Sequence, residues 1–134
     1  MKIWKQAVLF YLGGCAYMGL ELLWRGRSHG SMFIAGGTCF LLIGQLNQVQ
    51  PRLPLPLRAV TGAGIVTMVE LGMGLLCNRN FEVWDYRERA GNFLGQICPA
   101  FTVLWIPVSL MALGLHVLLS RRMDRVSVTR CAYL

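Results

Sequence analysis

The sequence predicts an all-α membrane protein in which four transmembrane helices form a compact bundle of two helical hairpins. Of the 134 residues, 55% are hydrophobic and only 14% are charged, whereas soluble domains carry about 25% charged residues. Four apolar runs each provide the roughly 20 residues that a helix needs to cross a bilayer. The charged residues gather between these runs and near the C-terminus. We therefore expect a single four-helix transmembrane domain over residues 1–134.

The first hairpin is predicted from two apolar runs, at about 7–24 and 31–49. Two lysines precede the first run, as in a signal peptide. The chain stays apolar beyond Cys15 as far as Trp24, which favours an uncleaved first transmembrane helix. The connection RGRSHG is short, so the two helices are expected to lie antiparallel and side by side.

The second hairpin is predicted at about 57–77 and 93–119. The link QPRLPLP that precedes it holds three of the five prolines and is typical of a stiff, extended segment. Pro99 and Pro107 lie within the last run, where we expect each to kink the helix. Residues 120–134 form a basic tail that we expect at the membrane interface. None of the four runs shows the sustained alternation of a membrane strand.

The charges predict an orientation and exclude several functions. Eight lysines and arginines lie on the side of the N-terminus, the middle link and the tail, against five on the other side. The positive-inside rule therefore places both termini in the cytoplasm. We expect the membrane to be the plasma membrane. The net charge of +7 suits anionic lipid head groups. Because no basic patch interleaves with exposed aromatics, we expect no nucleic-acid partner.

Metal, cofactor and enzymatic roles find no support in the motifs. The five cysteines form no C-x-x-C pair and no zinc-like spacing with histidine, so we expect neither a metal nor a cofactor. The phosphate-binding pattern G-x-x-x-x-G-K-[ST] is absent from the sequence, so the chain has no ATP site of that type. Acids cluster near Arg87, but no nucleophile and base accompany them, and we expect no enzyme.

The acidic residues inside the apolar runs are the candidate functional groups. Glu70 lies well inside the third run, where a charged acid costs about 2.5 to 3.5 kcal/mol on insertion scales. It could mark a transport pathway, pair with another helix, or face lipid in its protonated form. Glu21 lies nearer a helix end and has Arg25 four residues on, which allows a pair along one face. Either this is a pair at the membrane edge, or Glu21, Arg25, Arg27 and His29 line a polar path shared with Glu70.

The segment between the third and fourth runs carries a recognisable pattern. The matching positions are Trp84, Asp85, Tyr86, Asn92, Gly95, Ile97, Cys98 and Trp105. With Arg25 and Gly26 after the first run, they resemble the ABC-transporter type IV (permease-like) family of small multi-pass membrane proteins. Gln96 stands where that family usually has arginine, and HGSMFIAGG replaces its G-P-x-x-P-I-Y-G run.

The resemblance implies a permease-like subunit of a transporter. Glu21, Arg25 and Glu70 would line its path, and energy would come from a separate ATPase or an ion gradient. The alternative is a non-transporting membrane scaffold, or a lipid- or partner-binding protein, in which the same residues hold helices together. A lone four-helix unit encloses little room, so we expect a homo-oligomer or other membrane or ATPase subunits as partners, besides the lipid bilayer.

Overall fold

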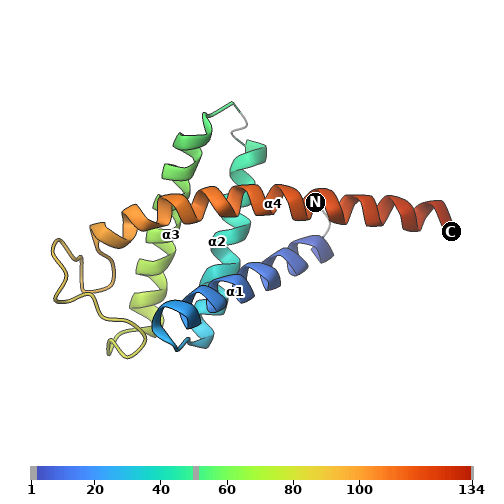
Figure 1. Cartoon of the computed structure of the whole chain (residues 1–134). Helices are drawn as coiled ribbons and strands as arrows, with labels where there is room; N and C mark the ends of the chain where they lie inside the picture. The colour runs from blue at the N-terminus through green and yellow to red at the C-terminus, as the bar shows by residue number, and fades with distance from the viewer. Residues whose placement is uncertain (1–2, 50–51, 134) are drawn as a thin grey trace.

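The computed structural model describes residues 3–49 and 52–133, and four α-helices account for most of them (Figure 1). They are α1 (Ile3–Arg25), α2 (Gly30–Val49), α3 (Leu55–Cys77) and α4 (Pro99–Tyr133). Within these ranges there is no β-strand, only an isolated bridge between Phe93 and Ile97. Each helix is long and apolar enough to cross a membrane. The predicted all-α membrane fold of four helices is therefore confirmed.

The outer helices of the chain, α1 and α4, cross the two middle helices, α2 and α3 (Figure 1). In Figure 1, α1 and α4 run in opposite directions across the pair formed by α2 and α3. Helix α2 is central, because it packs against α1, α3 and α4, whereas the described parts of α1 and α3 do not meet. Helices α1 and α4 contact each other at few points. Helices α1 and α4 therefore both cover α2 but leave a gap between them.

Glycines bring α1 and α2 close together. A Cβ atom on Gly37 of α2 would lie 2.7 Å from the backbone carbonyl oxygen of Phe10, and one on Gly13 of α1 would lie 2.5 Å from the Cβ of Phe40. Distances this short are possible only without side chains at these positions, as is common where membrane helices pack closely. The glycines therefore fix the spacing of the first hairpin.

The buried core lies where α2, α3 and α4 meet. Its members are Cys39, Ile43, Ala63, Val66, Trp105 and Leu113. Many large apolar side chains point outward instead, among them Leu23 and Met111. An apolar exterior around a small core is the pattern expected where lipid, rather than water, surrounds the helices.

The fourth helix differs from its prediction at both ends. It begins at Pro99 rather than near residue 93, because residues 78–98 fold into a hydrogen-bonded loop and proline suits the first helical position, where no N–H is needed. The expected kink at Pro99 is therefore wrong, while Pro107 does lie inside the helix. At the other end, α4 continues through the basic tail instead of ending near residue 119. No proline or glycine interrupts residues 120–133, and Asp124 forms an ion pair with Lys5 of α1.

Candidate functional site: the cleft between α1 and α4

The loop of residues 78–98 is organised by the side chain of Asn78. Its Nδ2 donates to the backbone oxygen of Trp84 at 2.6 Å and to Oε1 of Gln96 at 2.9 Å. Its Oδ1 accepts the backbone N–H of Val83 at 2.9 Å. Gln96 in turn donates to the backbone oxygen of Asn78 at 3.0 Å and accepts, through its own backbone oxygen, the indole N–H of Trp84 at 2.9 Å. Every one of these polar groups is paired within the loop, which gives it a defined shape.

The family-like residues serve mainly to build this loop. Trp84 is buried, and the side chain of Asn92 accepts the backbone N–H of Gly95, whose φ of 67° suits glycine. Asp85 forms an exposed ion pair with Arg87 at 2.7 Å. Hydrogen bonds from Arg87 hold the pKa of Asp85 below its usual range. Another motif residue, Tyr86, points toward the helices instead and bonds to Glu70 on α3.

Glu70 joins three parts of the chain. Its side chain is buried on α3, and its Oε1 accepts a hydrogen bond from the Tyr86 hydroxyl at 2.9 Å. Its Oε2 accepts the indole N–H of Trp105, on α4, at 3.2 Å. Burial first, and then the negative charge of Glu70, raises the pKa of Tyr86 well above its usual range. The tyrosine therefore stays protonated and acts as a donor.

Glu21 and Arg25 form the ion pair that their spacing of four residues predicts. Arg25 also donates from Nη1 to the backbone oxygen of Val83 at 2.7 Å. This second bond ties the end of α1 to the loop that carries Tyr86. The Glu21–Arg25 pair is only partly exposed, at 15% and 23% of the two side chains, so it lies at the edge of the bundle rather than free in solvent.

Arg27 and His29 lie apart from these groups. Both are exposed, and Nδ1 of His29 accepts the backbone N–H of Ser31 at 3.1 Å, in the first turn of α2. Within the described residues, neither side chain hydrogen-bonds to Glu21, Arg25 or Glu70. Arg25 does not bond to Glu70 either. The structure thus brings together Glu21 with Arg25, and separately Glu70 with two aromatic residues that the sequence did not single out as its partners.

Two cavities follow one another along the face between α1 and α4. The first, of about 280 Å³, extends from the middle of α1 and α4 down to α2 and α3. Its lining includes Ala16 on α1, Cys39 and Phe40 on α2, Val66 on α3, and Met111, Ala112 and Leu115 on α4. The second, of about 210 Å³, continues toward the loop and reaches Glu21, Trp24, Arg25, Tyr86 and Phe101. We call the two together the α1–α4 cleft.

An aromatic pair marks the junction of the two cavities. Tyr17 and Trp105 line both cavities, and their ring centroids lie 5.8 Å apart. Trp105 is the residue whose indole N–H bonds to Glu70, while Tyr86, the other partner of Glu70, stacks on Phe101 with ring centroids 4.8 Å apart. Glu70 therefore lies behind the wall of the cleft and fixes two of the aromatic side chains that form it.

Comparison with known proteins identifies one family. The sequence model of the family described as "Putative ABC-transporter type IV" matches residues 15–132. No curated protein and no solved structure matches the chain. The family match covers the second half of α1, all of α2, α3 and the loop, and nearly all of α4, and it confirms the resemblance drawn from the pattern around Trp84.

Proposed function

We propose that this chain, which belongs to the "Putative ABC-transporter type IV" family, is the membrane-embedded, permease-like subunit of a transporter. The observation that supports this role best is the α1–α4 cleft. Its two cavities lie in series along helices that are long enough to span a bilayer, and binding sites between helices are a common location for ligands.

Glu21, Arg25 and Glu70 have distinct places in this proposal. Glu21 and Arg25 line the cleft at the end next to the loop. Glu70 acts from behind the wall, through its bonds to Tyr86 and Trp105. In this role it positions Trp105 at the junction of the cavities and Tyr86 in the wall of the second one. A change in its hydrogen bonding would widen or narrow the passage there.

The proposal places the chain in a plasma membrane with both termini in the cytoplasm and with partner subunits around it. The arginines at the end of α4 then meet the cytoplasmic leaflet, whose anionic lipids attract them. A separate ATPase supplies the energy, and the chain has no catalytic step of its own. Two cavities of this size do not make a complete pore, which favours a homo-oligomer or an assembly with further membrane subunits.

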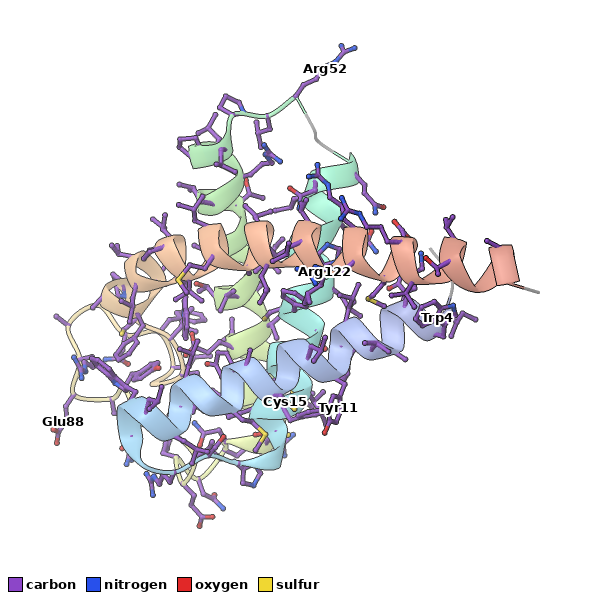
Figure 2. All side chains as sticks on the ribbon, turned by 45° about the vertical axis from the view of Figure 1, so that its right-hand side comes forward. Trp4, Tyr11, Cys15, Arg52, Glu88 and Arg122 are labelled. Atoms are coloured by element: carbon purple, nitrogen blue, oxygen red, sulfur yellow. The ribbon has the colours of Figure 1, made fainter. Side chains whose placement is uncertain are left out.

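The proposal is tested by purifying the tagged chain from its native membranes and identifying what accompanies it. An ATPase subunit is expected, and the complex is then placed in vesicles of the host's own lipids, where ATP hydrolysis is measured. Glu70→Gln is expected to lower the hydrolysis rate, and Glu88→Gln to leave it unchanged. Glu88 is an exposed acid at the outer edge of the loop, away from the helices (Figure 2), which makes it a matched control.

One result would contradict the transporter role, and another would contradict the role of Glu70 in it. If no ATPase accompanies the chain and added ATPase subunits do not bind it, the chain is not part of such a transporter. If Glu70→Gln hydrolyses ATP as fast as Glu88→Gln, Glu70 does not act on the passage.

A membrane scaffold or a lipid- or partner-binding protein is the second candidate. It is favoured by the bonding of the acids, because both oxygens of Glu70 and one oxygen of Glu21 already have partners within the chain. Such pairing holds helices together without any transport. A stable partner protein that shows no ATP hydrolysis in the reconstituted complex would support this candidate instead.

A further inference from the structure

We infer that the α1–α4 cleft takes an amphipathic lipid, with its apolar chain between the two helices and its head group beside Glu21 and Arg25. This inference rests on the proposed function, since it names the class of substrate that the path would carry. It follows from the walls of the cleft, its opening and its polar end.

The walls are almost entirely apolar. On α1 and α4 they consist of side chains such as Leu20, Val108 and Leu115, and the floor adds Phe40 and Val66. A hydrophilic solute in this space would lose its hydration and find few hydrogen-bonding partners, so each unpaired polar group would be unfavourable. A hydrocarbon chain loses nothing comparable and gains close contact with the walls.

The cleft opens sideways, toward lipid. Leu20, Met111 and Leu115 line it, yet they are 44%, 68% and 41% exposed. They therefore form a rim that faces both the cleft and the surroundings of the helices. Because α1 and α4 are membrane-spanning segments by length and composition, the surroundings of this rim are the hydrocarbon core of the bilayer. A lipid chain can enter directly, without crossing water.

The end of the cleft next to the loop is polar. Arg25 donates one of its five N–H groups to Glu21 and one to the backbone oxygen of Val83, and its Nη2 lies in ion-pair contact with the same carboxylate oxygen. The bonds of Glu21 to described residues involve only its Oε2. A ligand at this end thus meets guanidinium donors and a carboxylate acceptor side by side. A head group that both accepts and donates hydrogen bonds, such as a zwitterionic phosphate ester, complements this pair.

The aromatic junction supplies a natural reporter. Trp105 lines both cavities and is buried, so a chain that passes along the cleft lies against its indole. Trp4 and Trp24 are exposed, whereas Trp84 is buried in the loop. In a Trp4→Phe/Trp24→Phe background, the fluorescence therefore comes from Trp105 and from Trp84.

The experiment measures quenching of this fluorescence by a phosphatidylethanolamine brominated on its acyl chains, present as a minor component of phosphatidylcholine vesicles. Ala16 lines the cleft on α1, so Ala16→Phe fills it. Ala7 lies on the same helix, is exposed and does not line either cavity, so Ala7→Phe is the matched control. Acrylamide, a water-soluble quencher, is added in a parallel titration.

We expect the brominated lipid to quench the fluorescence of the Ala7→Phe variant as strongly as that of the parent, which is the Trp4→Phe/Trp24→Phe chain. The Ala16→Phe variant should lose most of that quenching. Equal quenching in Ala7→Phe and Ala16→Phe would overturn the inference, because it would mean that only lipid around the whole protein is seen. Strong quenching of the parent by acrylamide would also overturn it, since the cleft would then hold water. If Ala16→Phe fails to fold, Ala112→Phe fills the same cavity from α4.

A second arm separates a resident lipid from a transported one. In the complex with its ATPase, a transported lipid loses its quenching of Trp105 during ATP hydrolysis, whereas a resident lipid keeps it. Retained quenching therefore contradicts a substrate role. The presence of lipid in the cleft is measured before ATP is added. If the brominated lipid does not quench the fluorescence but the complex hydrolyses ATP normally, the lipid inference is refuted and the proposed function is not. Normal quenching without any ATPase partner would refute the proposed function alone.

Discussion

Replacing Glu70 by leucine or by glutamine separates the role of its hydrogen bonds from that of its charge. Leucine leaves two buried donors, the Tyr86 hydroxyl and the Trp105 indole N–H, without an acceptor. Glutamine can accept the indole N–H through its oxygen and donate to the tyrosine oxygen through its amide nitrogen. Both variants remove the charge, so their difference isolates the two bonds.

The expected difference follows from the energies of hydrogen bonds between membrane helices. These average about 0.6 kcal/mol, with a maximum of about 1.7 kcal/mol, so two bonds correspond to roughly 1–3 kcal/mol. We therefore expect Glu70→Gln to be more stable than Glu70→Leu by this amount. The assay is equilibrium unfolding in mixed micelles of rising SDS fraction, followed by far-ultraviolet circular dichroism and tryptophan fluorescence.

A variant of Tyr86 provides the control for this comparison. Tyr86→Phe removes one of the two donors, so the gap between glutamine and leucine at position 70 should fall by about half in that background. The reasoning is refuted if Glu70→Leu is as stable as Glu70→Gln. Glu70 would then be an ordinary buried group whose replacement by an apolar residue costs nothing, as is observed for some buried ion pairs.

Three further predictions concern helix packing, the loop and its exposed ion pair. Gly37→Ala should destabilise the first hairpin by about 1–3 kcal/mol through overpacking, whereas Gly19→Ala, where a Cβ meets nothing within 4 Å, should not; SDS unfolding compares the two. Asn78→Ala removes the acceptor and donors that shape the loop, so local opening should become easier by about 1–3 kcal/mol, and hydrogen exchange over residues 78–98 should accelerate. The folded pKa of Asp85 lies below its ordinary value, so its pair with Arg87 stabilises the loop above the unfolded pKa of about 3.9 and stops doing so as the pH falls through the folded pKa. A carbon-13 titration of the Asp85 carboxyl should accordingly give a lower midpoint in the parent than in Arg87→Gln, and equal midpoints would contradict the pairing.

The helices were predictable because their signal is local. Runs of about 20 apolar residues and short polar gaps were enough to place all four. The Glu21–Arg25 pair was predictable too, since four residues form one helical turn. The start of α4 was not, because Pro99 suits both a kink and a first turn, and the choice depends on how the preceding loop folds.

The partners of Glu70 had no local signal. Tyr86 and Trp105 lie 16 and 35 residues away in the sequence, and only the fold of the loop 78–98 and the packing of α4 against α3 bring them to Glu70. The roles of Asn78 and Gln96 were missed for a similar reason, since each bonds across 18 residues. The aromatic pattern around Trp84 was visible, but it indicated a family rather than a contact with Glu70.

The most direct test of the α1–α4 cleft as a transport path is ATP-driven movement of a fluorescent phosphatidylethanolamine between the leaflets of vesicles that contain the chain with its ATPase. Dithionite added outside bleaches the label in the outer leaflet and so measures the movement. We predict that the parent and Ala7→Phe move the lipid at equal rates and that Ala16→Phe, with the cleft filled, moves little. Movement by Ala16→Phe as fast as by Ala7→Phe would contradict the account.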